Sequence, residues 1–298
     1  MNNIDFSCKH DIWIRSDDGR LQRMDEPFFE SELIAPGTWK ILSDGDFTYL
    51  IEGDDEALVI DSGYGCGNIR EYCQSLTSKP VWRIANTHDH FDHTANNAYF
   101  EGAYMSEETR KRATIPFPSF SGIDFPRDYR IEVIDEGYVF FLGGRDIETL
   151  SIPDHAPGSL AFLDSKEKLF FTGDEVMHQG KSLRISVAAY EKQLQKLYAR
   201  RKEYDRLCTG GSGIISAVYI DNYLANARFI LAGNEGQPAQ PREVLPEPLP
   251  DEQGRMIYGR KVPRPMDLPK TWDADIEYKR MMNYADCTIV YDMRHIYG

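Results

Sequence analysis

Short apolar runs separated by Gly and Asp turns fill the first part of the chain, and this pattern predicts β-strands. Three runs rich in β-branched and aromatic residues span 38–42, 47–51 and 57–60. Residues 68–76 then carry apolar positions at helical spacing, and 81–86 form another apolar run. The order predicts a β-meander that leads into a strand–helix–strand unit.

The second half of the chain follows the same order, with strands first and helices later. The apolar runs 147–152, 160–163 and 168–172 predict three strands. Two longer segments, 187–203 and 216–231, have apolar residues at helical spacing. Strands that alternate with helices in both halves are typical of an α/β fold.

Three segments extend or depart from this regular pattern. Residues 113–129 mix prolines with aromatic residues and predict a long ordered loop, either a lid over an apolar substrate or a small core patch. Eight of the 16 prolines lie within 237–269, a density that excludes regular structure throughout that span. The end of the chain, 272–298, regains a helical pattern that leads into an apolar strand at 288–291.

Composition narrows the class of protein. The 298 residues include 34 Lys and Arg against 48 Asp and Glu, a formal charge of −14, which disfavours nucleic acid as a partner because binding it requires a basic face. The longest apolar runs fall well short of a membrane span, and the first residues do not resemble a signal peptide, so we expect a soluble, cytoplasmic protein. Five scattered cysteines favour reduced thiols over a disulfide framework.

Candidate chemistry is concentrated directly after the predicted strand 81–86. Three of the seven histidines, His88, His90 and His93, lie within six residues, together with Asp92 and a second aspartate. Imidazole and carboxylate groups are ligands for zinc, iron and manganese, and alternation places His88 and His90 on the same side of an extended chain. Because such a group would make a poor core, we interpret it as a metal site at a strand end.

The segment 88–93 resembles the His-x-His-x-Asp-His signature of the metallo-β-lactamase superfamily. Three further motifs of that family have counterparts in the right order, namely the Asp-Ser-Gly turn at 61–63, the Pro-x-His segment with Gly-Ser at 153–159, and the Thr-Gly-Asp at 172–174. Asp154 stands where the family has glycine. The resemblance covers residues 31–235.

Two metal positions are implied by this resemblance. The first would be held by His88, His90 and His155, the second by Asp92 and His93, and Asp174 would bridge them. The sequence departs from the family at the last ligand, because Ser212 stands where a Gly-His-Gly histidine is usual, and neutral serine is a weak ligand. Water, His178 and His295 are the candidates to replace it, so we expect one or two divalent ions, zinc first, with iron or manganese as alternatives.

The resemblance implies a four-layered αβ/βα sandwich over 31–235. Residues 1–30 would then be an N-terminal extension, and 236–298 a Pro-rich segment and tail that serves as a lid or as the arm of a homodimer. No organic cofactor is expected, because the glycines at 63–67 lack the spacing of a dinucleotide loop.

The implied function is hydrolysis of a small-molecule ester, thioester, lactone or amide by a metal-bound hydroxide. Asp92 is the residue that we expect to act in catalysis, by orienting the attacking water. Two alternatives stay open. One is a mononuclear iron oxygenase acting on a thiol or persulfide, and the other is a non-catalytic metal-binding member of the family.

Overall fold

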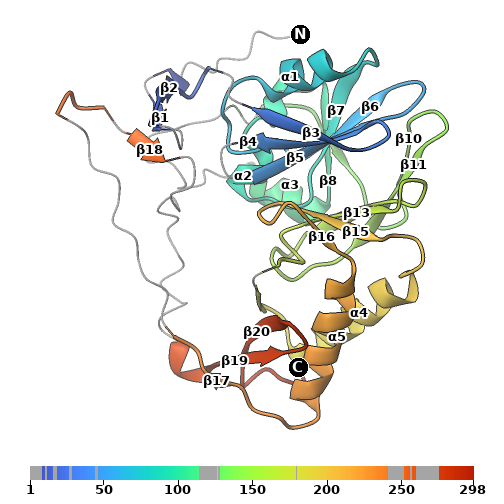
Figure 1. The fold of residues 1–298 in the computed structure, drawn as a ribbon, viewed down its shortest axis with the longest axis vertical. Helices are drawn as coiled ribbons and strands as arrows, with labels where there is room; N and C mark the ends of the chain where they lie inside the picture. Colours follow the sequence, from blue (N-terminus) through green and yellow to red (C-terminus); the bar gives the residue numbers. More distant parts are fainter. Residues whose placement is uncertain are drawn as a thin grey trace.

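The computed structural model describes most of the chain. The described residues are 9–10, 12–15, 19–26, 29–43, 46–113, 126, 128–178, 180–240, 252–255, 257–259 and 275–298. Figure 1 shows two sheets stacked near the middle of the molecule, with helices next to each.

The first sheet has seven strands in sequence order. They are β3 (Glu30–Ala35), β4 (Thr38–Ser43), β5 (Asp46–Glu52), β6 (Ala57–Ile60), β7 (Val81–Ala85), β8 (Gly102–Met105) and β9 (Ile131–Val133). The strands from β3 to β6 pair antiparallel, whereas those from β6 to β9 pair parallel. The carboxyl ends of β6, β7 and β8 therefore share one edge of the sheet, where functional groups gather in α/β proteins.

The second sheet has six strands. Their order is β10 (Val139–Phe141), β11 (Asp146–Ser151), β12 (Leu160–Asp164), β13 (Leu169–Gly173), β15 (Arg206–Thr209) and β16 (Ile214–Ser216). Only β13 and β15 pair parallel within this sheet, and the helix α4 (Val187–Ala199) lies between them in the sequence.

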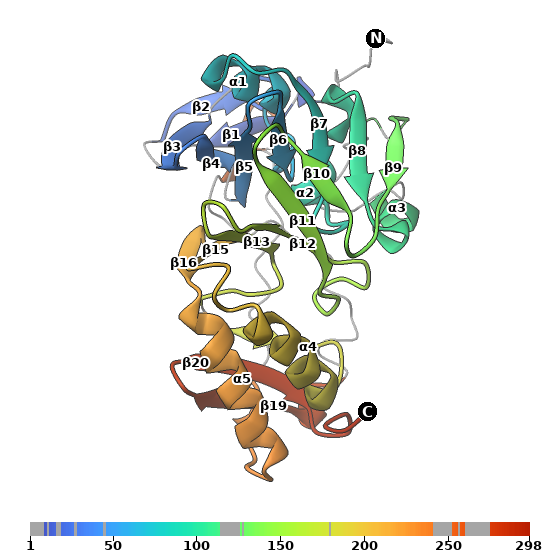
Figure 2. The same cartoon turned by 90° about the vertical axis from the view of Figure 1, so that its right-hand side faces the viewer.

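Three of the four buried clusters found in the described part of the chain lie in succession across the two sheets, which makes the architecture four-layered. One core packs the first sheet against α1 (Ile69–Leu76), and another lies between the two sheets. The third packs the second sheet against α4 (Val187–Ala199) and α5 (Val218–Leu231), on the side away from the first sheet (Figure 2). The predicted αβ/βα sandwich is thus confirmed.

Shorter elements complete the first half. Their bounds are α2 (Phe91–Thr94), η2 (Asn97–Tyr99) and α3 (Glu107–Ala113). A small sheet joins β1 (Trp13–Arg15) to β2 (Leu21–Arg23) and, in parallel, to β18 (Ile257–Gly259). A strand within the proline-rich region thus pairs with the N-terminal region.

The C-terminal segment forms a hairpin that packs on α5. Its strands β19 (Lys279–Tyr284) and β20 (Cys287–Asp292) follow the short helix η3 (Ile276–Tyr278), and they form a sheet with β14 (Lys181–Ser182) and β17 (Gln237–Pro238). Ile289 and Tyr291 are buried in the same core as α4 and α5. The hairpin is therefore integrated into the second half.

Several local predictions need correction. The helix expected from about residue 94 is instead the short α2, which ends at Thr94, because the chain turns helical directly after His90. The helical pattern around 276–282 was also wrong, since 279–284 pair with β20 and leave only one 3-10 turn before them. Short segments such as β8 and α3 were not predicted.

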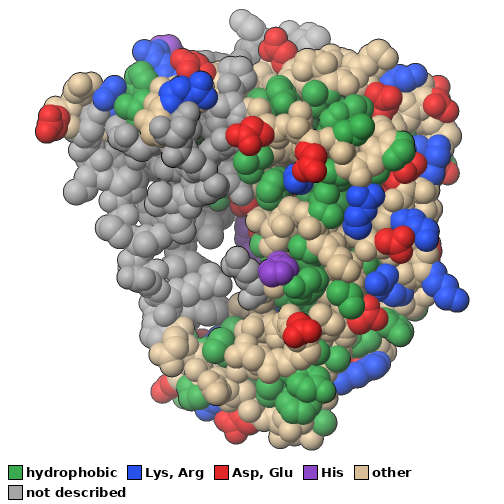
Figure 3. Space-filling view, viewed as in Figure 1, with side chains coloured by type: hydrophobic (Ala, Val, Ile, Leu, Met, Phe, Trp, Pro, Cys, Tyr) green, Lys and Arg blue, Asp and Glu red, His purple; other side chains and the backbone are tan. Residues whose placement is uncertain are grey.

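The described residues also bear on the predictions about the cysteines, the aromatic loop, membrane-spanning segments and surface charge. Four cysteines are buried, namely Cys66, Cys73, Cys208 and Cys287, and the fifth lies outside the described residues. Most of the aromatic loop at 113–129 also lies outside them. No helix in the described part of the chain is long and apolar enough to cross a bilayer. Acidic and basic side chains are interspersed over the described part of the face in Figure 3.

Arg145 joins the two sheets at the end away from the carboxyl end of β7. Its guanidinium, 4% exposed, donates from Nε to Asp164 Oδ2 at 2.9 Å. The same side chain donates from Nη1 to the backbone carbonyls of Pro36 (3.1 Å) and Glu52 (3.0 Å), which belong to the first sheet's loops and strands.

We expect Arg145→Met to lower the free energy of unfolding by about 3–5 kcal/mol, because it leaves the buried Asp164 carboxylate unpaired. Urea denaturation measures this loss. The exposed Lys166→Met is the control and should change stability by no more than about 0.5 kcal/mol. A loss below about 1 kcal/mol for Arg145→Met would show that the ion pair contributes little to joining the sheets.

Candidate metal centre

Six side chains from three strand ends meet at one edge between the sheets. His88, His90, Asp92 and His93 come after β7, His155 comes after β11, and Asp174 comes after β13. The ring centroid of His88 lies 4.5 Å from that of His90, 4.0 Å from that of His93 and 4.9 Å from that of His155. The residues singled out in the sequence are therefore brought together.

Two groups of ligand atoms are compact enough to hold an ion. His88, His90 and His155 form one group, and His88, His93 and Asp174 form the other, with ligand atoms within 4.8 Å of one another in each. In the first group, His90 Nδ1 lies only 2.9 Å from His155 Nε2. Two imidazole lone pairs at that distance repel unless a proton or a cation lies between them.

The Asp174 carboxylate faces both groups. Its Oδ2 lies 3.7 Å from His155 Nε2, and its Oδ1 lies 3.7 Å from His93 Nε2. Asp92 Oδ2 lies 3.5 Å from the same His93 nitrogen. An aspartate with one oxygen directed to each group has the geometry required of a bridging ligand.

Buried polar atoms without partners test whether a cation suits this site. Among the described residues, His88 Nε2, His93 Nε2 and Asp174 Oδ1 are buried and have no hydrogen-bond partner. Such atoms normally find a partner, because leaving one unsatisfied in the interior costs about 1–3 kcal/mol. Imidazole nitrogen and carboxylate oxygen are ligand atoms for divalent metals, so the donor set fits such an ion.

Asp61 holds the ligand loop that follows β7 by hydrogen bonds to Thr87 and His93. Its backbone is in the left-handed region with φ of 59°, and its carboxylate accepts from the Thr87 N–H and hydroxyl, each at 2.7 Å. His93 Nδ1 donates to Asp61 Oδ2 at 2.8 Å, which leaves Nε2 free to face the centre. Thr87 Oγ1 also lies 3.0 Å from His88 Nδ1. Hydrogen bonds of this kind to the ring of a ligand fix its orientation and its tautomer.

Burial and charge set the protonation of the ligands. Burial lowers the pKa of His88 well below its usual value and the pKa of His155 to about 3, so both rings are neutral near pH 7. Burial acts in the same direction on His93, but Asp61, Asp92 and Asp174 hold its pKa well above the usual value. Burial opposes ionisation of Asp174, yet His93 keeps the pKa of this carboxyl low.

Two residues of the site were missed in the sequence. Asp46, at the start of β5, is 8% exposed, and burial followed by repulsion from Asp92 and Asp174 raises its pKa well above the usual value. Tyr64 forms a side-chain hydrogen bond with Asp46. Neither residue lies in a ligand-like motif, and only the pairing of β5 with its neighbours brings this carboxylate to the edge where β7 ends.

The segment 210–213 closes the centre by backbone rather than by a side chain. A Cβ at Gly210 would overlap Asp174 Oδ1 and would lie 2.7 Å from His93 Cε1, so only glycine allows this approach. Ser212 lies outside both ligand groups, and its hydroxyl accepts from the His178 N–H at 3.3 Å.

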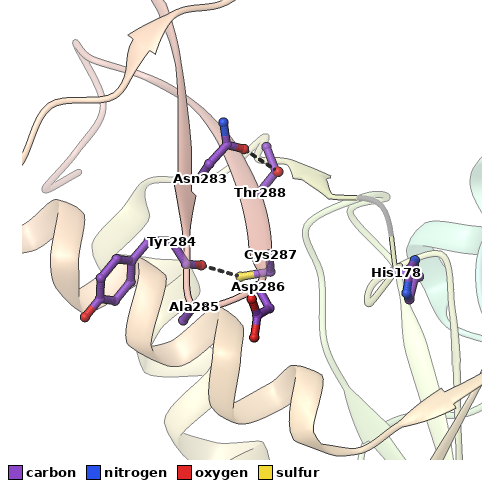
Figure 4. A pocket seen from close by; sticks show the side chains of 7 residues that line it. All are labelled: His178, Asn283, Tyr284, Ala285, Asp286, Cys287 and Thr288. Atoms are coloured by element: carbon purple, nitrogen blue, oxygen red, sulfur yellow. Dashed lines mark hydrogen bonds between the residues drawn. The ribbon is translucent and has the colours of Figure 1, made fainter.

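The suggested replacements for the missing histidine lie elsewhere. His178 lines a cavity of about 540 Å³ beside the turn of the β19–β20 hairpin (Figure 4), and its ring lies 5.2 Å from that of Tyr219. His295 is exposed near the C-terminus. Neither belongs to the two ligand groups found among the described residues.

Histidines and aspartates grouped in this way at the edge of an αβ/βα sandwich are typical of metal-binding proteins of one fold class. The sequence profile of the metallo-beta-lactamase superfamily matches residues 45–211, more than half of the chain. The chain belongs to this superfamily.

Two relatives of this chain are named as thioesterases. The chain is 27% identical over 183 residues to the atrochrysone carboxyl ACP thioesterase of Aspergillus fumigatus, an alignment that covers 56% of this chain and 54% of that protein. It is also 27% identical over 157 residues to the acyl-coenzyme A thioesterase MBLAC2 of Gallus gallus, covering 43% and 56%. The chain thus spans about half the length of the curated relatives it matches.

Solved structures agree on the fold. A metallo-beta-lactamase from Pontibacter korlensis superposes with a TM-score of 0.53 at 16% sequence identity, over 67% of this chain and 99% of that one. At such identity the likeness supports the architecture and not the activity.

The histidines predict a pH dependence of the metal-free chain. His88, His90 and His155 have lowered pKa values in the fold and take up protons on unfolding, so they make the free energy of unfolding fall as pH drops below 6.5, for His155 down to its pKa of about 3. His93, with a raised pKa, contributes with the opposite sign, but below pH 6.5 that contribution is complete and constant.

We expect His155→Gln to make this fall shallower than in the parent, by up to about 1.4 kcal/mol per pH unit. Urea unfolding of chelator-treated protein at successive pH values measures the slope. The exposed His295→Gln is the matched control and should keep the parent slope. Equal slopes for His155→Gln and the parent would contradict a buried, neutral His155.

Proposed function

We propose that this protein is a metal-dependent hydrolase of thioesters. The observation that carries the proposal is the pair of ligand groups sharing His88, with Asp174 directed to both. Two relatives named as thioesterases, one for an acyl-coenzyme A and one for an acyl carrier protein, favour a thioester among the esters, lactones and amides that the family resemblance allows. The substrate is thus an activated small-molecule acyl group.

In this proposal the residues divide into two ligand sets. The first set is His88, His90 and His155, the second is Asp92 and His93, and Asp174 bridges them. A divalent ion held there, zinc in our proposal, supplies Lewis acidity toward the scissile carbonyl and lowers the pKa of a coordinated water. The low pKa values of His88 and His155 support the first set, since only neutral imidazole binds a metal. At the second set, binding of an ion would displace the proton that Asp61, Asp92 and Asp174 keep on His93 by raising its pKa.

Asp92 is the proposed catalytic residue. Its side chain is 13% exposed, and although burial favours its neutral form, His93 holds its pKa below the usual value, so the carboxylate is ionised near pH 7. An ionised carboxylate at the edge of the centre can accept a hydrogen bond from the attacking water and orient it. It can take up the proton that this water loses on attacking the carbonyl carbon, and pass that proton to the thiolate that leaves when the C–S bond breaks.

The two alternative functions, an iron oxygenase and a non-catalytic metal-binding protein, are distinguished by metal content and by turnover. An iron oxygenase acting on a thiol or persulfide would contain iron and consume oxygen, whereas a non-catalytic member would bind metal without turnover. The cytoplasmic location and the homodimer stay predictions from sequence, as does the division into 1–30, 31–235 and 236–298.

We expect the metal-loaded protein to release free thiol from acyl-coenzyme A thioesters, as measured with a thiol-reactive chromophore. His88→Ala and Asp174→Asn should each lower kcat/KM by at least about 10²-fold, because each removes a group from the charged centre. His295→Ala, an exposed histidine, is the control and should keep full activity. Retained turnover in both centre variants, or no turnover across a range of acyl chains, would reject the proposal.

A further inference from the structure

A buried charge network lies directly behind the metal centre. Lys181 is 4% exposed, and its Nζ lies 2.9 Å from Asp154 Oδ2 and 2.5 Å from Glu175 Oε2. Both carboxylates are also buried, at 3% and 2% exposure of the residue. Asp154 precedes the ligand His155 and Glu175 follows the ligand Asp174, so the network touches both ligand segments.

Glu175 clamps the loop that carries His155. Its carboxylate accepts from the backbone N–H groups of Asp154 (3.0 Å), His155 (2.9 Å) and Ala156 (3.4 Å). A carboxylate that accepts several backbone N–H groups fixes a loop firmly, because these bonds are charge-assisted. The position of the His155 ring relative to Asp174 is therefore set by a side chain next to Asp174.

Asp154 anchors the opposite side of the network. Its Oδ1 accepts from the N–H groups of Arg184 (2.7 Å) and Ile185 (3.0 Å), just after β14. This is the position where the family pattern has glycine, so a buried negative charge has been added in this chain. Two buried carboxylates require a buried cation, which Lys181 provides.

The location of Lys181 is set by the C-terminal hairpin. Lys181 and Ser182 form β14, which pairs in parallel with Ile289 and Val290 of β20. The Leu183 N–H continues the ladder by donating to the Val290 carbonyl at 2.8 Å. This hairpin lies beyond residues 45–211, so the superfamily profile does not include it.

We propose that Lys181 is a positioning residue for the first metal ligand set, and that the C-terminal hairpin is the element that holds Lys181 in place. The ammonium neutralises Asp154 and Glu175, Glu175 fixes the His155 loop beside Asp174, and β20 fixes the strand from which the ammonium projects. The tail of this chain thereby becomes part of the support of the metal centre. This inference rests on the proposed metal site and is independent of the substrate.

The test is the metal affinity of folded variants, measured by competition with a chromophoric chelator well below the melting temperature. Lys181→Met should weaken binding by up to about 10–100-fold, the range seen when a group that orients a metal ligand is removed. Lys181→Arg keeps the charge and should recover most of the affinity. The visible spectrum of the Co²⁺-substituted protein should change in Lys181→Met and return toward the parent spectrum in Lys181→Arg.

The hairpin has its own variant. A Cβ at Gly180 would lie 3.1 Å from Thr288 Cβ, and φ of +131° there disfavours other residues, so Gly180→Ala should displace β14 from β20. We expect weaker metal binding although every ligand and Lys181 are unchanged. Should Lys181→Met not fold, Glu175→Gln tests the same clamp and should also weaken binding. The exposed Lys192→Met is the matched control and should bind as the parent does.

Each outcome decides the inference. Parent-like affinity and Co²⁺ spectrum in Lys181→Met or, if that variant does not fold, in Glu175→Gln would overturn the role of Lys181, even if the melting temperature falls. Parent-like affinity in Gly180→Ala would overturn the role of the hairpin. A parent protein that binds no metal would overturn both this inference and the proposed function, whereas a parent that binds metal without hydrolysing thioesters would reject only the function.

Discussion

The structure depends on one constraint, which is that buried ligand atoms at the sheet edge need a positive partner. His88 Nε2, His93 Nε2 and Asp174 Oδ1 are buried without a hydrogen bond, and the ionised carboxylate of Asp92 adds negative charge beside them. The fold holds these groups together against their repulsion. A divalent cation satisfies all of these atoms at once, which hydrogen bonding within the described residues does not.

Buried charged residues that are not ligands themselves hold the ligand segments in position. Asp61 fixes the loop after β7, and the network of Lys181, Glu175 and Asp154 fixes the segments after β11 and β13. Both supports use buried charges that bond to backbone N–H groups or to ligand rings. The centre therefore draws on both sheets and on the C-terminal hairpin, far more of the chain than the ligand motifs themselves.

Sequence reasoning found the parts whose signal is local. The strands at 38–60 and the clustered histidines each give a signal within a few adjacent residues, so both could be recognised in the sequence. The fold class could be predicted from them. Asp46 and Lys181 could not be found, because each is an isolated residue that reaches the site only through strand pairing. The strand β19 was mistaken for a helix because its partner β20, not its own periodicity, decides its structure.

The central claim is that this edge binds metal, and elemental analysis of the purified, folded protein tests it most directly. Mass spectrometry of the metal content against protein concentration gives the stoichiometry and the identity of the ion in one measurement. The account predicts at least one transition-metal ion per chain, with zinc as the expected element. A folded chain that stays free of transition metal after exposure to zinc, iron and manganese would contradict it.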